Sequence, residues 1–448
     1  MNRIPSPREA WQALRSGGGL TAQSLAVFLF KVAGAGLQFA FYFVLARTLG
    51  TEGFGLFDLV LTLVMFLGTV VLWGGSKSIM QYAGRLKARA RQNEVGGVFL
   101  RLVGLTLGFS LPLGIVLWFT GDWLAVQAFG EPQLGFHLKR LGLAFPFFAL
   151  FFLNLDMLRA TDRLRWSEFL RNLPKPVLAI AITLVLFTTD RLAGEGVLWL
   201  VVSVHVLLAA LTAVPVAFGA RGRHGWRSTV PTGDLVRSGW SLMLTMIIVL
   251  LLGTIDRVMI TGFLDLEDNG LYAAAAKLIL PIDFVLMAVN QVIATRIADH
   301  YFAGQRNALQ TLLHRSTRLI VLASLPIMVG IAALGAFFLG LLGPEFEAAR
   351  WVLYILIVGR LVNVFCGPVG NFFTMTGHQG EFRNFLFMAV VLNIGLNALL
   401  IPRMGVEGVA LATAVSLITW NVLGALYVKQ RLGFRVFFWP FGAPMDDD

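Results

Sequence analysis

The stretch LARTLGTEGFGLFDLV, residues 45–60, lies between two long apolar runs, and a related stretch, ITGFLDLEDNGLYAAA, residues 260–275, lies between another two. Both place a short acidic, glycine-containing turn between segments of helical length. Gly55-Leu56-Phe57 aligns with Gly270-Leu271-Tyr272. The same corner is therefore encoded twice, about 215 residues apart, which indicates an internal duplication.

The duplication extends over the whole chain. A shift of about 215 residues places residues 158–170 on 373–385, and 193–197 on 405–409 after a small change of register. Six apolar spans in each half superimpose in this way. Because six is even, both halves enter the membrane from the same side, and such parallel repeats are related by an axis along the membrane normal. The corner glycines are expected to provide conformational freedom in tight turns.

The composition excludes a water-soluble globule. The chain has 448 residues, of which 57% are hydrophobic and 14% are charged, with a mean hydropathy of +0.76. Soluble domains carry roughly 25% charged residues. The net charge of +11 would suggest nucleic acid as a partner of a soluble protein, but in a membrane protein basic residues anchor cytoplasmic loops. We therefore expect no nucleic-acid partner. The single cysteine, Cys366, cannot form an internal disulfide.

Charged breaks divide the apolar sequence into twelve predicted spans. They are 20–46, 54–76, 95–118, 135–157, 174–189, 196–218, 235–262, 270–292, 316–342, 351–373, 384–401 and 405–427. The predicted fold is an all-α polytopic membrane protein with twelve transmembrane helices. These form two six-helix lobes related by pseudo-two-fold symmetry, V-shaped around a central cavity that carries the substrate path.

Lysine and arginine collect in the N-terminus and in every second loop thereafter, and this bias orients the chain with both termini in the cytoplasm. The basic residues of the predicted cytoplasmic loops are Lys77, Arg85, Lys87, Arg89, Arg91, Arg159, Arg163, Arg165, Arg171, Lys175, Arg221, Arg223, Arg227, Arg237, Arg296, Arg306, Arg315 and Arg318. The predicted domains are a cytoplasmic segment 1–19, an N-lobe 20–218, a cytoplasmic linker 219–234, a C-lobe 235–428 and a cytoplasmic tail 429–448.

Three stretches resemble one family of transporters. Residues 30–64, FKVAGAGLQFAFYFVLARTLGTEGFGLFDLVLTLV, resemble the first two helices of the polysaccharide flippases, within the multidrug/oligosaccharidyl-lipid/polysaccharide exporter superfamily. Residues 252–278, LGTIDRVMITGFLDLEDNGLYAAAAKL, are similar to that family's seventh helix and the corner after it. Residues 404–416, MGVEGVALATAVS, look like the start of its twelfth helix. The resemblance covers nearly the whole chain, from about residue 20 to 428.

The resemblance implies a flippase for polyprenyl-pyrophosphate-linked oligosaccharide. Such a protein moves a repeat unit of O-antigen, capsule or exopolysaccharide to the outer leaflet of the bacterial inner membrane by alternating access. The implied partners are this lipid-linked substrate, the phospholipid bilayer, and a polysaccharide polymerase with a chain-length regulator. The related lipid II flippases usually have fourteen helices, so twelve spans make that branch less fitting.

A few basic residues lie inside or at the edges of the predicted spans. They are Lys31, Arg101, Lys139, Arg140, Arg257, Lys277 and Arg360. A charge at a helix centre costs at least about 2.5–3.5 kcal/mol on insertion scales, so it usually faces a wet cavity or a partner. We predict that Lys31, Arg257, Lys277 and Arg360 form a cationic, substrate-binding cavity for the pyrophosphate. The alternative is that they neutralise buried acids. The other three lie near span ends, where long side chains reach the interface.

Buried carboxylates are the candidates for ion coupling. Asp283, in the middle of the eighth span, is the first candidate, and Asp256, near the outer end of the seventh, is the second. Each is able to take up and release a proton during transport. The alternative for each is a structural ion pair or a hydrogen bond to backbone.

The sequence lacks the motifs of common enzymes. It has no G-x-x-x-x-G-K-[ST], no H-E-x-x-H and no G-x-S-x-G. We expect no enzymatic activity, cofactor or metal. Two other functions stay open. A cation-coupled multidrug or metabolite exporter of the same architecture would have a cavity dominated by acids. A membrane glycosyltransferase or polymerase would need a large outer loop, whereas the longest loops here are basic and cytoplasmic by prediction.

Overall fold

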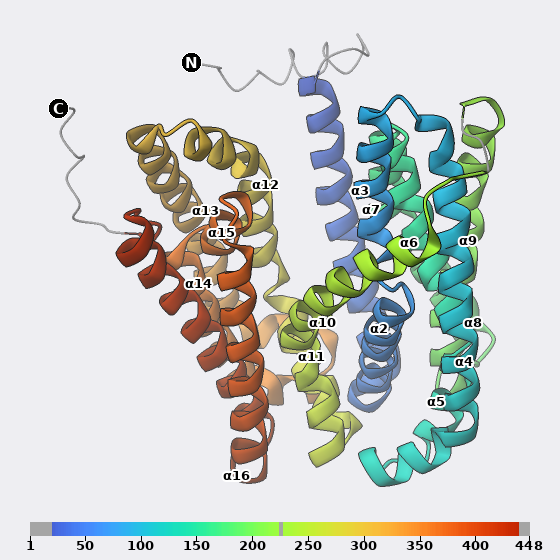
Figure 1. Cartoon of the computed structure of the whole chain (residues 1–448). Helices are drawn as coiled ribbons and strands as arrows, with labels where there is room; N and C mark the ends of the chain where they lie inside the picture. Colours follow the sequence, from blue (N-terminus) through green and yellow to red (C-terminus); the bar gives the residue numbers. More distant parts are fainter. Residues whose placement is uncertain (1–19, 224–226, 439–448) are drawn as a thin grey trace. The chain divides into compact units, whose positions relative to one another are not determined.

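The computed structural model describes residues 20–223 and 227–438. Within these ranges all regular structure is helical, as the hydropathy pattern predicted (Figure 1). The predicted segment 1–19, part of the predicted linker 219–234 and the end of the predicted tail 429–448 lie outside the described residues.

Among the described residues, nine helices are long and apolar enough to cross a bilayer. The helices α5 (Leu134–Leu141) and α6 (Phe145–Ala160) meet at a bend of 49° and pass the same test together, so that as one span they give a tenth. The nine include two helices of unusual length, α2 (Leu20–Val71) with 52 residues and α16 (Gln379–Tyr427) with 49. A bilayer core of about 30 Å needs only about 20 helical residues, so each of these two must turn back.

Glycine provides both turns. Gly50 in α2 has φ 67° and Gly405 in α16 has φ 58°, a left-handed backbone that side chains disfavour. Figure 1 shows α16 as two antiparallel segments, of which the second is coloured red. Each of the two long helices therefore counts as two crossings, and together with the other spans they give the predicted twelve.

The first half contains five further helices and one 3₁₀ turn. They are α3 (Gly75–Ala88), η1 (Gln92–Glu94), α4 (Val95–Phe129), α7 (Leu164–Asn172), α8 (Pro174–Thr188) and α9 (Glu195–Arg223).

The fifth span begins earlier than the sequence predicted. Residues Leu164–Thr188 form one apolar segment of α7 and α8, whereas the predicted span was 174–189. Pro174 occupies the first turn of α8, a position that proline favours at the start of a helix, but the helical backbone also extends before it. Arg171 and Lys175 both lie within this helical segment, and their side of the membrane stays a prediction.

The second half contains the remaining helices of the described residues. Its other helices are α10 (Thr232–Phe263), α11 (Leu266–Leu278), α12 (Leu280–Phe302), α13 (Arg306–Leu342), η2 (Pro344–Ala349), α14 (Arg350–Cys366), α15 (Val369–Met375) and the π-helix η3 (Val428–Leu432). The predicted tenth span, 351–373, is interrupted at Gly367, whose φ is 71°.

The contacts divide the chain into two compact units. Unit 1 comprises the described residues of Met1–Leu49 and Leu56–Ile247, and unit 2 comprises Gly50–Gly55 and the described residues of Ile248–Asp448. The division falls inside α10, whereas the sequence placed it in the linker before that helix. The lobes 20–218 and 235–428, and the central cavity between them, stay a prediction.

The two duplicated corners pack against each other within unit 2. A Cβ atom on Gly55 would lie 1.8 Å from the carbonyl oxygen of Leu266, and one on Gly270 would lie 2.0 Å from that of Thr51. The Asn269 side-chain amide donates to the Gly55 carbonyl over 2.8 Å. Close backbone approach therefore requires these two glycines, in addition to the turns that the sequence predicted.

Candidate functional site

Lys31 lies on α2 in unit 1, where its charge meets a buried acid. Its Nζ is 4.0 Å from Oε2 of Glu168 on α7, and the side chains are 19% and 2% exposed. Gly34, three residues farther along α2, allows this approach, because a Cβ there would lie 2.5 Å from the carbonyl oxygen of Asn172. Lys31 thus has the ionic partner that the sequence left open as an alternative.

The pair belongs to a larger buried charge cluster. Arg159 on α6 forms ion pairs with both Glu168 and Asp156. Arg171 Nη2 is 3.0 Å from Asp156 Oδ1, and the Ser76 hydroxyl also donates to Asp156. We call Lys31, Asp156, Arg159, Glu168 and Arg171 the unit 1 charge cluster. It holds three cations and two acids, so it carries an excess positive charge.

The cluster also contains hydrogen-bond donors that have no acceptor among the described residues. The Nε groups of Arg159 and Arg171 are buried without a hydrogen-bond partner among the described residues. Buried N–H groups normally have an acceptor, and guanidinium groups suit the paired oxygens of phosphate. The arrangement is able to accept an anion.

Sequence reasoning found only Lys31 of this cluster. The two arginines were interpreted as loop charges that set the topology. One usable signal was present, since Asp156 with Arg159 and Glu168 with Arg171 are each three residues apart. That spacing puts each pair on one helical face. Lys175 lies near the cluster in sequence and lines a small cavity with Gln38 and His205.

In unit 2 the structure brings two predicted site residues together. Arg360 on α14 forms an ion pair of 3.1 Å with Asp283 on α12, and their side chains are 27% and 32% exposed. The structural ion pair was the alternative for Asp283. Lys277 is partly buried on α11.

Asp256, on α10, is enclosed by neutral donors. Its side chain is 1% exposed. The Tyr272 hydroxyl and the Thr413 hydroxyl each donate to Oδ2 over 2.8 Å. The amides of Asn393 and Asn397 donate to Oδ1 over 3.1 and 3.0 Å. These five residues, the Asp256 network, connect α10, α11 and both segments of α16.

The amide groups of this network have a second possible arrangement. Oδ1 of Asn397 is buried without a hydrogen-bond partner among the described residues. A rotated amide would present oxygen instead of N–H toward the carboxylate. Carboxylate, amide and hydroxyl oxygens are ligands that suit a small cation. Next to the network, the Arg257 guanidinium lies 5.7 Å from the centre of the Tyr272 ring.

The three basic residues predicted at span ends have partners in unit 1. Arg101 donates to the carbonyl of Ser228 over 2.6 Å. Lys139 forms an ion pair with Asp122, and the Arg140 guanidinium lies 3.8 Å from the centre of the Phe136 ring.

Comparisons with known proteins place this geometry in context. A family model described as polysaccharide biosynthesis protein matches residues 20–299, and a second, MatE, matches 241–399. The probable low-salt glycan biosynthesis flippase Agl15 of Haloferax volcanii is 25% identical over 181 residues, which are 40% of this chain and 38% of that relative.

Two solved structures share the fold over most of the chain. The lipid II flippase MurJ in an inward closed conformation superimposes with a TM-score of 0.73 at 13% identity, covering 91% of this chain and 87% of that one. An inward-facing multidrug resistance MATE family transporter gives 0.75 at 12% identity, covering 92% and 98%. At these identities the likeness shows the fold.

Proposed function

Because the chain belongs to the polysaccharide biosynthesis protein family, we propose that it flips polyprenyl-pyrophosphate-linked oligosaccharide across a membrane by alternating access. The observation that carries this proposal is the unit 1 charge cluster. A buried site with more cations than acids, and with unused guanidinium donors, suits a diphosphate that has lost its water.

In the proposed cycle the diphosphate displaces protein carboxylates from their cations. Lys31 and Arg171 exchange Glu168 and Asp156 for phosphate oxygens. Arg360 exchanges Asp283 in the same way, and Arg257 and Lys277 remain proposed contacts in unit 2. Buried ion pairs recover little more than their desolvation cost, so an incoming anion of higher charge competes well.

We propose Asp256 as the coupling residue, with Asp283 as the second candidate. The four donors around Asp256 hold its carboxylate in a fixed place. Rotation of the two amides would complete an oxygen cage for a proton or a small monovalent cation. Uptake and release of that cation would then accompany the change of access.

The setting of the proposal is a bacterial inner membrane, with both termini in the cytoplasm. The glycan is a repeat unit of O-antigen of lipopolysaccharide, capsule or exopolysaccharide, and the partners are a polymerase and a chain-length regulator. The protein acts as a transporter and not as an enzyme.

A cation-coupled multidrug exporter is the second candidate. It is favoured by the MatE match over residues 241–399 and by the buried carboxylate of Asp256. The excess of cations in unit 1 disfavours it, because cationic drugs need acids.

A flipping assay tests the proposal. Purified protein in vesicles is given a fluorescent polyprenyl-diphosphate glycan, and a membrane-impermeant reductant reports the label that reaches the outer leaflet. Lys31→Ala and Arg171→Ala are expected to slow flipping by about tenfold or more, as expected for a lost charged hydrogen bond. Lys31→Arg should retain most of the rate.

Lys87→Ala is the matched control, since Lys87 forms an exposed ion pair with Asp162 and should flip at the wild-type rate. Wild-type rates in folded Lys31→Ala and Arg171→Ala proteins would remove the cluster from the mechanism. Transport of a cationic dye in place of the glycan would favour the exporter.

A further inference from the structure

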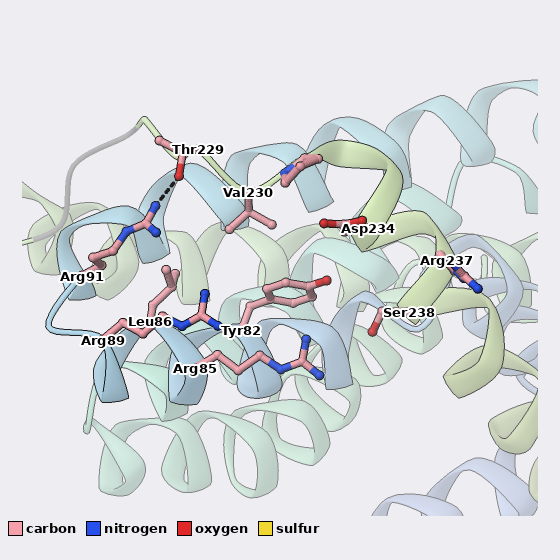
Figure 2. Close-up of a pocket in the computed structure, with 11 residues that line it drawn as sticks. Tyr82, Arg85, Leu86, Arg89, Arg91, Thr229, Val230, Asp234, Arg237 and Ser238 are labelled. Carbon is pink, nitrogen blue, oxygen red and sulfur yellow. Dashed lines mark hydrogen bonds between the residues drawn. The ribbon is translucent and has the colours of Figure 1, made fainter.

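A basic pocket lies in unit 1, apart from the proposed transport residues. Its volume is about 470 Å³. It is formed by α3 and the residues after it on one side, and by residues 229–238 at the start of α10 on the other (Figure 2). The charge bias assigns this side of the protein to the cytoplasm. Its lining residues include four arginines and one acid: Arg85, Arg89, Arg91, Arg237 and Asp234.

Most of these arginines have no ion-pair partner among the residues that the structure describes. Arg91 forms an ion pair with Glu94 over 2.6 Å and also donates to the Thr229 hydroxyl (Figure 2). Within the described ranges, no ion pair involves Arg85, Arg89 or Arg237. Three guanidinium groups therefore border one concave space whose lining contains a single carboxylate.

The pocket is a built structure and not a loose set of surface charges. The Thr229 backbone N–H donates to Glu94 over 2.8 Å, which holds the segment before α10 in place. Tyr82 and Leu86 are buried, 8% and 4% exposed, along the α3 side. The Arg85 guanidinium lies 5.2 Å from the centre of the Tyr82 ring, so its direction is also set.

An aromatic surface adjoins the pocket. Trp73 stacks on Phe109 with ring centres 4.4 Å apart, contacts Trp240 at 5.0 Å, and donates to the Val236 carbonyl over 3.1 Å. Trp240 is 48% exposed. It lies three residues after Arg237, so both share one face of α10. Tryptophan is enriched where a membrane meets water, and basic residues beside it attract anionic headgroups.

We propose that this pocket binds the phosphate group of a membrane lipid, with the guanidinium groups on the phosphate and the lipid tail beside Trp240. An anionic phospholipid and a polyprenyl diphosphate share this chemistry. A lipid bound here would join α3 to the segment that precedes α10.

Binding of lipid to the purified full-length protein in neutral detergent tests the site. Fluorescent phosphatidylglycerol is the probe, and phosphatidylcholine, polyprenyl diphosphate and inorganic pyrophosphate are the competitors. An Arg89→Ala, Arg237→Ala double variant is expected to bind the probe about tenfold or more weakly, as for a lost charged hydrogen bond. Lys87→Ala, which removes one positive charge from α3 outside the pocket, should bind like wild type.

The competitors identify the source of the phosphate. Stronger competition by polyprenyl diphosphate supports a site for the substrate lipid, and stronger binding of phosphatidylglycerol supports a site for bilayer lipid. Equal binding by wild type and the double variant would overturn the proposal, as would equal competition by phosphatidylcholine. Binding of pyrophosphate without binding of either anionic lipid would also overturn it. Thermal unfolding of each variant verifies the fold, and no transport activity is required.

Discussion

The acids Asp156 and Glu168 of unit 1 face three cations, whereas the acid Asp256 of unit 2 faces four neutral donors. Neutral donors satisfy a carboxylate without adding charge, so the Asp256 network is a net anion. The unit 1 charge cluster is a net cation with donors left over. The difference assigns the two regions different ligands, an anion in unit 1 and a small cation in unit 2.

The largest effect is expected from removing an acid of the unit 1 charge cluster. Glu168→Ala leaves Lys31 and Arg159 without this partner, and breaking a buried pair costs about 3–5 kcal/mol. We expect a large fall in thermal stability of the purified protein. The exposed pair of Lys87 and Asp162 provides the control, because Lys87→Ala should cost less than about 1 kcal/mol. Equal losses of stability in the two variants would mean that the charges of the cluster are as well solvated as those of an exposed ion pair.

Replacing the acid of the Asp256 network in unit 2 should leave the protein folded and remove the coupling of flipping to an ion gradient. Asp256→Asn retains the shape of the side chain and one acceptor oxygen, so it should cost only about 1–3 kcal/mol. Flipping measured with and without imposed sodium and proton gradients should lose its dependence on the driving gradient. Gradient dependence that survives in a folded Asp256→Asn protein would transfer the coupling role to Asp283.

The duplicated corner tests the contribution of close packing to stability without any change of charge. Gly270→Ala places a methyl group on the Thr51 carbonyl, and overpacking typically costs about 1–3 kcal/mol. Gly395→Ala in α16 is the matched control, since a Cβ there meets nothing within 4 Å. Alanine is a better helix former than glycine by about 1 kcal/mol, so Gly395→Ala should unfold at the same temperature as wild type or higher. An unchanged unfolding temperature of Gly270→Ala would contradict the close packing of the two corners.

The smallest effect is expected at Asp268, an acid that is only partly buried, which sharpens the contrast with the fully buried acids. Partial burial raises the pKa of Asp268 to about 6, and nearby Asp265, Glu267 and Glu407 add to the rise. The folded protein therefore favours the protonated form, and this stabilisation is lost as the pH rises from about 4 to about 6. Asp268→Asn should stabilise the protein above pH 6 by less than about 1 kcal/mol, because solvent screens the site. Unfolding temperatures across this pH range measure it, and an unchanged pH profile would contradict it.

Local patterns predicted the helical fold well. Apolar runs between charged breaks predicted the crossings, and the repeated glycine corner predicted the duplication, because both depend on residues close in sequence. The sequence placed the start of the fifth span at Pro174, because proline favours the first turn of a helix. It did not show that another helix, α7, comes directly before this proline. The unit 1 charge cluster was missed because it depends on tertiary contacts. The sequence position of an arginine at a span end does not show whether its side chain is solvated or paired with Asp156. The pairing of Arg360 with Asp283 also depends on tertiary contact, and the sequence offered it only as an alternative.

The central claim is that the cations of unit 1 accept a diphosphate. The most direct measurement compares flipping of one fluorescent glycan on two lipids, a polyprenyl diphosphate and an uncharged polyprenyl carrier, by the wild-type protein in vesicles. We predict rapid flipping of the diphosphate-linked glycan alone. Equal flipping of both lipids, or of the uncharged one only, would contradict a function for the unit 1 charge cluster in binding the headgroup.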